Sequence, residues 1–289
     1  MHDERDKVMD KSMTTYELSE KELRELQMIQ LDMLCEVDRI CRKCNIHYNI
    51  IAGTLLGAVR HQGYIPWDDD ADVALLRSEY ERFREVCKTE LDHDKFYFQD
   101  HTNTEGYRWG YGKLRRKETL FLREHQEDMP YDQGVFIDIF PLDNVSDSKF
   151  GRGWMNFQCF ILRKAMWAPI GIKASDNMLK KISYRMLLKL PDSFVYGRYE
   201  KLVKRCKGIN SGWVRILTFP APNSEYAYLR KWYENSEEIL FEQTAFWGIK
   251  DRDEYLKFKY GDYMQLPGAK DRKVHGVTAI KLVDTDNNA

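Results

Sequence analysis

Residues 53–72 read GTLLGAVRHQGYIPWDDDAD, and the acidic end of this stretch decides how the rest of the chain is interpreted. Four carboxylates fall within five positions, around the start of an apolar run. Side chains two positions apart on a strand point to the same face, so a strand over 70–76 would project Asp70 and Asp72 together. Two adjacent carboxylates repel each other unless a cation lies between them, and Mg²⁺ prefers oxygen ligands of this kind. The stretch therefore predicts a divalent metal site.

A third carboxylate supports this prediction from elsewhere in the chain. Asp138 lies in the middle of the apolar run VFIDIF at 135–140, which predicts a buried strand that ends at Pro141. A charge at a buried position needs a partner, and a metal shared with the two aspartates of the earlier strand would supply one. The predicted metal ligands are Asp70, Asp72 and Asp138.

Two other metal motifs are incomplete. A calcium loop that starts at Asp68 would need glycine at its sixth position, but Val73 stands there, at the start of apolar strand material. The spacing Cys41-x-x-Cys44 is typical of half a zinc site, but no second pair follows at a suitable distance. Asp68 and Asp69 are accordingly interpreted as cap or turn residues, and the cysteines as part of helix packing.

Upstream of the aspartates, Gly53-Thr54 reads as a tight turn that follows an apolar strand and precedes a short helix at 55–61. Backbone N–H groups and a hydroxyl at a helix N-terminus favour a bound phosphate. Arg60 and His61 follow, the first as a phosphate partner and the second as an acid or base. A phosphate held beside metal-binding aspartates points to phosphoryl transfer as the reaction class.

The remaining pattern predicts an α+β fold. Three helix starts are predicted from serine or aspartate followed three positions later by glutamate: Ser19-x-x-Glu22, Ser78-x-x-Glu81 and Asp251-x-x-Glu254. The first opens a long helix with one apolar stripe that includes Cys44, and the last opens a helix that stops at Gly261. Strands are predicted at 47–52, 70–76, 96–99, 107–115, 119–122 and 135–140. Helices are predicted between 150 and 207, with breaks at Pro169 and Pro191.

The composition is that of an ordinary globular chain of 289 residues, with 43% hydrophobic and 31% charged residues. No window approaches the ~20 apolar residues of a membrane span, and the first residues lack the apolar segment of a signal peptide. We therefore expect a cytoplasmic protein. Residues 149–207 carry fourteen Lys and Arg against three acidic residues, although the whole chain has a net charge of −1. This basic segment suits an anionic polymer or membrane surface, and the solvated faces of ordinary amphipathic helices explain it equally well.

Three motifs together resemble the LicD family, which includes bacterial phosphocholine transferases and is related to the fukutin group. The motifs are the run at 53–73, QGVFIDIFPLD at 133–143 and YGDYMQLP at 260–267. The resemblance implies a nucleotidyltransferase-like fold, in which a mixed sheet carries a Gly-Ser/Thr turn, a DxD strand and a third acidic strand. Ala71 departs from the family, where a larger aliphatic residue is usual. The match is weak over 146–235, which leaves the acceptor open.

The resemblance also implies a reaction, in which a glycan hydroxyl attacks the phosphorus attached to choline in CDP-choline and CMP leaves. Asp70 and Asp72 would hold Mg²⁺ (or Mn²⁺) against the diphosphate, and Asp138 would complete the metal site and assist removal of the hydroxyl proton. The expected phosphate partners are Gly53, Thr54, Arg60, and Lys113 or Arg115. Choline is a quaternary ammonium and calls for an aromatic cage. The candidates for the cage are Tyr64, Trp67, Tyr107, Trp109 and Tyr111.

The chain divides into five predicted segments. They are a flexible tail at 1–15, a catalytic core at 16–145, a basic and mainly helical acceptor- or membrane-facing subdomain at 146–235, a segment at 236–278 that returns to the core, and a tail at 279–289. The third motif continues into an acidic, aromatic turn, so we expect residues 260–275 to form a flap over the cleft. Asp262 would support the site from this flap, and His275 lies at its end. The glycan acceptor would be lipid-linked at the inner membrane face in one version of this scheme, and no nucleic-acid partner is expected.

Two other interpretations stay open. The same fold could transfer another alcohol phosphate, such as ribitol or glycerol phosphate, or a nucleotidyl group. A DxD glycosyltransferase or a non-catalytic sugar-phosphate-binding module is the alternative from a different class. A DxD glycosyltransferase normally builds several βα units before its metal motif, whereas here one strand precedes it. A non-catalytic module would be expected to lose a carboxylate, and all three are present.

Overall fold

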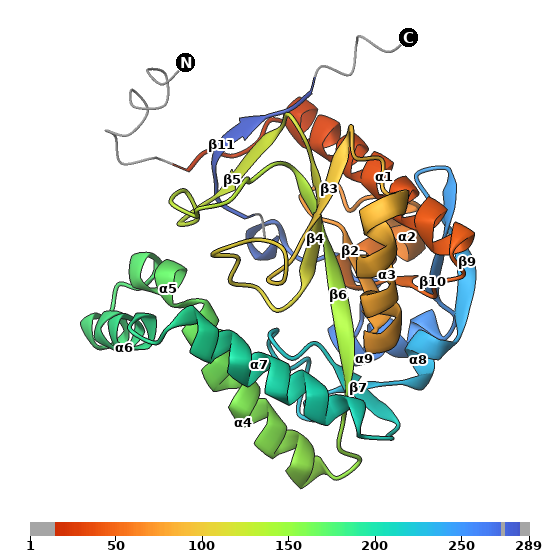
Figure 1. The fold of residues 1–289 in the computed structure, drawn as a ribbon. Helices are drawn as coiled ribbons and strands as arrows, with labels where there is room; N and C mark the ends of the chain where they lie inside the picture. The colour runs from red at the N-terminus through yellow and green to blue at the C-terminus, as the bar shows by residue number, and fades with distance from the viewer. Residues whose placement is uncertain (1–14, 273–274, 284–289) are drawn as a thin grey trace.

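The computed structural model describes residues 15–272 and 275–283 and has the predicted α+β architecture (Figure 1). A nine-stranded mixed sheet has the order β3-β4-β6-β2-β1-β10-β9, with β7 paired to β6 and β8 paired to β7. The strands are β1 (Asn49–Ile50), β2 (Asp72–Leu76), β3 (Phe96–Gln99), β4 (Gly112–Arg116), β5 (Leu120–Arg123), β6 (Phe136–Val145), β7 (Trp213–Arg215), β8 (Tyr228–Leu229), β9 (Ser236–Phe241), β10 (Thr244–Ile249) and β11 (Val277–Lys281). The helices are α1 (Glu20–Lys43), α2 (Ala52–His61), α3 (Arg77–Glu90), α4 (Lys149–Met166), α5 (Ala168–Ala174), α6 (Met178–Leu188), α7 (Asp192–Lys207), α8 (Lys231–Glu234), α9 (Arg252–Tyr260) and the short 3-10 helix η1 (Ala269–Asp271).

The long first helix, α1, begins where its capping box predicts. Ser19 Oγ accepts a hydrogen bond from the backbone N–H of Glu22 at 3.2 Å, and the Glu22 carboxylate accepts one from the backbone N–H of Ser19 at 2.9 Å. The apolar stripe of α1 is buried in the main core, whereas Cys44, its last predicted member, is only partly buried. The buried members of the stripe are Leu26, Ile29, Met33, Val37 and Ile40.

Of the two other predicted helix starts, the one at Ser78 is wrong and the one at Asp251 is confirmed in position. Ser78 lies inside the first turn of α3, which has no side-chain cap. The reason is that Leu76 still pairs with Leu142 of β6, so no residue is left between strand and helix to act as a cap. α9 does begin after Asp251, but without a side-chain cap bond, and it ends at Gly261 as predicted. Gly261 has a φ of +71°, a conformation that favours glycine at the end of a helix.

Local structure around the acidic stretch differs from the prediction at its boundaries. α2 begins before Gly53, so Gly53 and Thr54 lie in the first helical turn and do not form a separate turn. β2 begins at Asp72, so Asp70 lies in the connection that precedes the strand. The alternation argument therefore does not apply to Asp70, and its position depends on the loop that holds it.

β6 continues through Pro141, where the sequence predicted its end. β4 pairs with the first part of β6 up to Ile139, and β7 pairs with it from Asp143 onward. Pro141 lies between these two partners, where a missing N–H is tolerated. On its other side β6 stays paired with β2 over the whole length of β2. β6 therefore runs on past the end of β4 toward the helices that follow it.

β4 begins later than predicted. Residues 107–111, expected in the strand, form no ladder because hydroxyl groups of α7 bind their carbonyls. Tyr199 donates a hydrogen bond to the carbonyl of Gly110 at 2.7 Å, and Tyr196 donates one to the carbonyl of Tyr107. This segment is therefore shaped by a helix that lies about ninety residues later in the chain.

Helices α4 to α7 form what we call the helical unit, residues 149–207. Its breaks fall at Pro169 and Pro191, as predicted, because Pro169 stands in the first turn of α5 and Pro191 precedes α7. The unit has an apolar cluster separate from the main core, formed mainly by Met155, Cys159, Leu162, Val195, Leu202 and Val203. β7 and β8 extend the main sheet, so the mainly helical part of the predicted 146–235 segment ends at Lys207, and only the short α8 follows in that segment. No helix in the described residues has both the length and the apolar character needed to span a bilayer.

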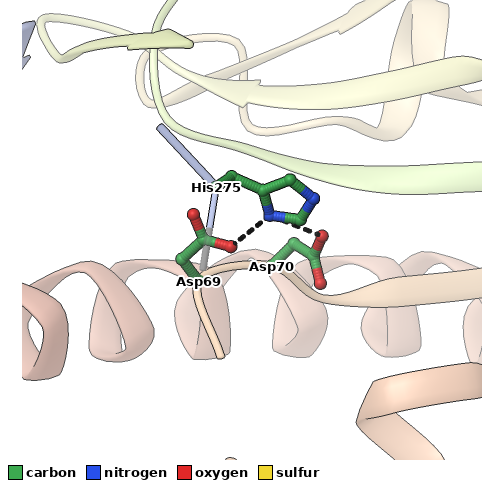
Figure 2. A group of neighbouring side chains, drawn as sticks. All are labelled: Asp69, Asp70 and His275. Carbon is green, nitrogen blue, oxygen red and sulfur yellow. Dashed lines mark hydrogen bonds and ion pairs between the residues drawn. The ribbon is translucent and has the colours of Figure 1, made fainter. Parts of the chain in front are cut away.

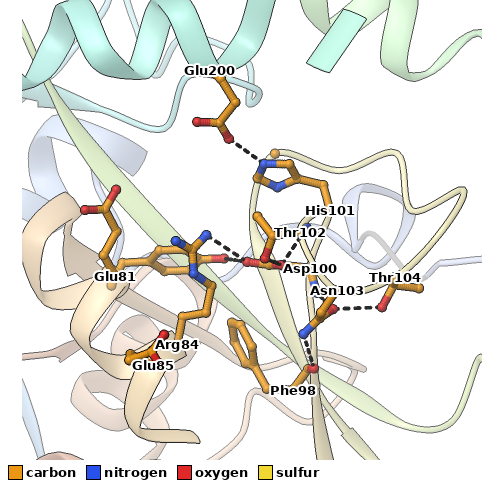
Figure 3. A network of polar contacts seen from close by, with 12 residues as sticks. Glu81, Arg84, Glu85, Phe98, Asp100, His101, Thr102, Asn103, Thr104 and Glu200 are labelled. Atoms are coloured by element: carbon orange, nitrogen blue, oxygen red, sulfur yellow. Dashed lines mark hydrogen bonds and ion pairs between the residues drawn. The ribbon is translucent and has the colours of Figure 1, made fainter. Parts of the chain in front are cut away.

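Polar contacts tie the helical unit to the core. Figure 3 shows the loop after β3, where His101 Nε2 lies 2.6 Å from a carboxylate oxygen of Glu200 on α7. Deeper in the junction, Arg77 of α3 makes two hydrogen bonds with Asp143 of β6, at 2.8 and 2.6 Å. Arg77 also donates to the hydroxyl of Tyr199 on α7 at 3.1 Å. A buried ion pair thus connects α3, β6 and α7.

The C-terminal segment returns to the core, as expected. β11 pairs antiparallel with β5, and Tyr16 forms an isolated bridge with Val277 (Figure 1). Residues 279–281 were predicted as tail but belong to this strand. The rest of the predicted tails falls on 1–14 and 284–289, outside the described residues, except for Thr15 and residues 282–283.

Candidate active site

Three charged residues form a row across the sheet. Asp72 of β2 and Asp138 of β6 are register partners in a parallel pair, and Asp138 and Lys113 of β4 are partners in an antiparallel pair. Register partners on neighbouring strands project to the same face of a sheet. Lys113 Nζ donates a hydrogen bond to Asp138 Oδ1 at 2.5 Å. Burial lowers the pKa of Lys113 to about 8, and the neighbouring Asp138 opposes that shift.

A second group of charges lies in the connection just before β2 (Figure 2). His275 Nδ1 lies 2.7 Å from Asp69 Oδ1 and 3.9 Å from Asp70 Oδ2. Arg123, the last residue of β5, lies 3.5 Å from Asp69 Oδ1 and 3.8 Å from Asp70 Oδ2. The predicted return of the chain to Asp70 is therefore confirmed for His275. His275 lies two residues before β11 in the sequence, and the pairing of β11 with β5 brings it beside the aspartates.

These carboxylates perturb one another strongly. Burial raises the pKa of Asp72 well above its usual range, and the charges of Asp70, Asp138 and Asp68 add to the shift. Burial also raises the pKa of Asp68 well above its range, with further contributions from Asp70 and Asp69. Asp69 behaves differently, because Arg123 and His275 outweigh the effect of its burial and lower its pKa. The site thus concentrates more negative charge than its own cations neutralise.

The residues present fit a divalent cation. Asp69 Oδ2 is buried and has no hydrogen-bond partner among the described residues. Ligand atoms of Asp69, Asp70 and His275 all lie within 4.8 Å of one another. Carboxylate oxygens predominate in the surrounding donor set, which suits Mg²⁺ or Mn²⁺. The predicted ligand set Asp70, Asp72 and Asp138 stays a prediction, because the tightest group that the described residues form contains Asp69 and His275 in place of Asp72 and Asp138.

Gly53 and Thr54 lie directly behind the acidic stretch. Thr54 Oγ1 accepts a hydrogen bond from the backbone N–H of Asp72 at 2.8 Å, so it fixes the start of β2. A Cβ atom on Gly53 would stand 2.7 Å from Asp68 Oδ2, closer than a carbon and an oxygen can approach without a shift. The absence of a side chain at Gly53 therefore leaves room for the Asp68 carboxylate. Phosphate binding by this pair stays a prediction.

Three predicted cationic or acid–base residues are engaged elsewhere. Arg60 donates to the carbonyl of Tyr263 at 2.7 Å and to the ring of His61 at 3.0 Å. Burial and the charge of Arg60 lower the pKa of His61. Arg115 is buried and donates to the side chain of Gln99 at 2.6 Å. It also donates to the backbone carbonyl of Gly134, just before β6, at 2.7 Å. Within the described residues, none of the three contacts a carboxylate of the acidic group.

The predicted aromatic cage is divided between core and cleft. Trp109 and Tyr111 line a cleft of about 310 Å³ together with Lys113, Arg123, Asp138 and His275. Tyr64 and Tyr107 are buried in the protein interior, and Trp67 is covered by the guanidinium of Arg272 at 4.3 Å from its ring centre. Asp262 is exposed, and in the described structure no hydrogen bond or ion pair joins its side chain to the acidic group.

Sequence reasoning missed two residues of this site. Asp69 was interpreted as a turn residue, although it is 1% exposed and contacts both His275 and Arg123. Arg123 directly follows the predicted strand at 119–122, and only the structure shows that it lies within 4 Å of Asp69 and Asp70. No local signal separates Asp69 from a turn residue, because the two residues that it contacts are distant in the sequence.

Comparison with known proteins agrees with this geometry. Residues 45–170 match the profile of the LicD/FKTN/FKRP nucleotidyltransferase domain. Over 264 residues the chain is 28% identical to the lipopolysaccharide cholinephosphotransferase LicD of Haemophilus influenzae, which covers 88% of this chain and 96% of that protein. An uncharacterised protein of Rickettsia typhi is 35% identical over 94 residues, or 30% of this chain and 29% of that protein. An uncharacterised protein of Rickettsia prowazekii is 40% identical over 70 residues, or 24% and 25%.

The mixed sheet agrees with a nucleotidyltransferase-like fold, and the similarity to a named cholinephosphotransferase assigns the chain to the transferases. The part of the chain that matches the nucleotidyltransferase domain of the LicD family is residues 45–170, which include the acidic stretch and Asp138. The resemblance stated from the three motifs is thereby confirmed. Two of the motifs, at 53–73 and 133–143, lie inside the matched region, and YGDYMQLP lies beyond it.

Proposed function

We propose that this protein transfers phosphocholine from CDP-choline to a hydroxyl group of a cell-surface glycan or its precursor and releases CMP. The observation that carries the proposal is the excess of buried carboxylate at one edge of the sheet, beside Lys113 and Arg123. Such a site calls for a divalent cation and for an anionic group bound to it. The full-length similarity to a lipopolysaccharide cholinephosphotransferase supports this choice of donor and acceptor.

The roles of the chain's own residues follow from their contacts. Asp69, Asp70 and Asp72 would hold the cation, which when bound neutralises the diphosphate of the donor. Lys113 holds Asp138 Oδ1 at 2.5 Å, so we assign the proton of the attacking hydroxyl to Asp138 Oδ2. The acceptor oxygen forms a bond to phosphorus, the bond from phosphorus to CMP breaks, and Arg123 offers positive charge to the leaving phosphate. Trp109 and Tyr111 present aromatic faces in the same cleft, which is the environment that a quaternary ammonium prefers.

We also propose that the helical unit contacts an anionic membrane surface, where a lipid-linked acceptor would be found. Of the 18 large hydrophobic side chains that are exposed in the described residues, 11 lie in this unit. On α4 they recur at three- and four-residue spacing and so form one stripe. The members of the α4 stripe are Phe150, Trp154, Phe157 and Ile161. Exposed cations follow on α6, among them Lys180 and Arg185, so apolar and basic side chains occur together as in helices that lie on bilayers.

The reaction is tested by incubating the purified protein with Mg²⁺, CDP-choline and choline-free lipopolysaccharide, and by measuring CMP. Release of CMP that needs the acceptor and stops with EDTA is the expected result. Parallel incubations with CDP-ribitol, CDP-glycerol and a UDP-sugar identify the donor. Release of CMP from CDP-ribitol or CDP-glycerol alone would support the reaction type but would show that phosphocholine is not the transferred group. Release of UDP from the UDP-sugar would favour a glycosyltransferase, and binding without release from any donor would favour the non-catalytic module.

A further inference from the structure

A second pocket, of about 330 Å³, lies beside the candidate active site. It is bounded by α4, by the segment before β4 and by the residues after β7. Three aromatic side chains, Trp109, Tyr111 and Phe219, line both this pocket and the surroundings of Asp138 and Lys113. The two spaces are therefore separated only by shared aromatic walls, and a substrate that extends from one can reach the other.

The pocket carries positive charge that the protein does not neutralise. Arg163 and Lys164 of α4 line it, and no acidic residue does. Arg163 is partly buried, and among residues 15–272 and 275–283 it has no ion pair or side-chain hydrogen bond. Burial lowers its pKa, and the nearby charge of Arg215 adds to the shift, so this guanidinium lies in an unfavourable electrostatic environment. A third cation, Arg108, differs because Asp192 and the carbonyls of Ala165 and Met166 bind it.

Lys164 is held in a defined position. Its Nζ donates to the hydroxyl of Tyr184 at 2.7 Å and lies 5.7 Å from the ring centre of Trp167. Two of the three protons of an ammonium group remain for a ligand after one such bond. Arg163 and Lys164 are consecutive in the sequence, and both line the same pocket. The pocket thus combines two cations available to a ligand with flat aromatic walls.

From this combination we infer that the pocket binds the anionic part of the acceptor, a glycan that carries a phosphate or carboxylate group. The identification of this ligand as the acceptor rests on the proposed function. Sugar rings pack against aromatic side chains, and a hydrogen bond from Arg or Lys to an anionic group is stronger than one between neutral groups. The choline group is excluded because it is itself a cation. The base and ribose of the donor carry no charge that could neutralise Arg163. The donor diphosphate is already assigned to the cation held by Asp69, Asp70 and Asp72.

The experiment measures binding without turnover. Quenching of tryptophan fluorescence is titrated with glucose 6-phosphate, glucuronate and neutral glucose, in EDTA and without any CDP-alcohol. Trp109 and Trp167 line the pocket and report occupancy. We expect both anionic sugars to bind and glucose to bind at least tenfold more weakly. In R163Q/K164Q the affinity for the anionic sugars should fall tenfold or more, while R198Q, on α7 and outside the pocket, leaves it unchanged.

Several results would overturn the inference. Equal affinity for glucose and glucose 6-phosphate would show that the anionic group is not recognised. Unchanged affinity in R163Q/K164Q would show that the sugar phosphate binds outside this pocket. Displacement of the bound sugar phosphate by CMP would assign the pocket to the nucleotide. Circular dichroism and melting temperature of R163Q/K164Q show whether the variant is folded, and single R163Q replaces it if it is not. Because no donor or metal is present, failure here leaves the proposed transfer untouched, and failure of CMP release leaves this binding result standing.

Discussion

At the scale of single residues, Gly53 controls the space behind the acidic site. A Cβ atom here would stand 2.7 Å from Asp68 Oδ2. We expect G53A to displace the Asp68 carboxylate and to lower the transfer rate about tenfold or more, because a misplacement of about 1 Å near a reacting centre can cost up to ~100-fold. Stability should change by less than about 1 kcal/mol, since the contacted atom ends a flexible side chain. Steady-state kinetics and urea unfolding measure the two effects.

Gly197 provides the matched control. It lies inside α7, and a Cβ atom there would meet nothing within 4 Å. G197A should therefore raise the free energy of unfolding by about 0.5–1 kcal/mol, the usual gain of alanine over glycine in a helix, and leave activity unchanged. Equal loss of activity in G53A and G197A would contradict the role assigned to Gly53.

Asp72 is the strongest test of the acidic group. We expect D72N to lower transfer by roughly 1000-fold, because a bound cation contributes several kcal/mol to such a reaction. The fold should be retained, and in EDTA the variant should melt at the same or a higher temperature, since the pKa of Asp72 is raised by burial and neighbouring charges. D262N is the control, because Asp262 is exposed. Loss of activity in D262N equal to that in D72N would show that the third motif acts in catalysis directly.

The sequence identified part of this site, and physical reasons limit the rest. Asp72 and Asp138 could be predicted because each stands in or beside an apolar strand, where a charge is conspicuous. Asp69 could not be separated from a turn residue, because its burial depends on Arg123 and His275, which lie 54 and 206 positions away. Local patterns report local structure, and this part of the site is made by distant contacts.

At the scale of elements, the ion pair of Arg77 and Asp143 joins α3 to β6. Their side chains are 9% and 1% exposed. We expect D143N to lower the free energy of unfolding by about 3–5 kcal/mol, because it leaves a buried cation without its charge partner. The double variant R77M/D143L should recover most of this loss, since it removes both charges. Urea unfolding of the wild type, R77M, D143L and R77M/D143L forms a double-mutant cycle, and additive effects would show that the pair is not coupled.

Glu200 and His101 connect α7 to the loop after β3 near the surface (Figure 3). The hydrogen bond from His101 lowers the pKa of Glu200 despite partial burial. A carboxyl whose pKa is lowered by folding stabilises the protein above its unfolded pKa, and the contribution is lost as pH falls through the folded value. E200Q should therefore melt below the wild type at pH 7 by an amount equivalent to less than about 1 kcal/mol. The difference should shrink as pH falls below the ordinary pKa of a glutamate and disappear once it is below the lowered pKa of Glu200, and a difference that persists in strong acid would exclude this hydrogen bond as its cause.

Element boundaries show where sequence patterns lose information. The apolar run at 135–140 correctly predicted a buried strand, but Pro141 did not end it because the partner on one side changes from β4 to β7 at that point. Ser78 failed as a cap because α3 follows β2 without a connection. In both cases the residue keeps its usual conformational preference, proline against a strand interior and serine for a helix N-cap. Pairing with the neighbouring strands overrides that preference.

At the scale of the whole molecule, the exposed apolar side chains of the helical unit predict binding to anionic membranes. Trp154 and Phe157 stack on each other at 5.6 Å and are 58% and 52% exposed. W154S/F157S should weaken sedimentation with phosphatidylserine vesicles at least tenfold. L240S is the control, since Leu240 of β9 is equally exposed outside the unit.

The basic residues of α6 should add an electrostatic part. Each cation near an anionic bilayer contributes about 1 kcal/mol, so K180Q/K181Q should weaken vesicle binding roughly 30-fold at low salt. The loss should shrink as salt rises, because exposed charges are screened over ~10 Å at 0.1 M. Equal binding of the wild type to neutral and anionic vesicles would leave these residues as ordinary solvated helix faces.

The pairing of β11 with β5 has a consequence for how this protein is made. A ribosome delivers the chain from its N-terminus, so Asp69 and the strands that carry Asp72 and Asp138 leave it long before His275 does. The nascent chain can fold much of its sheet first, as domains commonly do during synthesis. Its acidic edge then waits, without its histidine, for the last strand to arrive. Completion of the acidic group is thus tied to completion of the chain, because His275, which contacts Asp69, is among the last of its residues to be synthesised.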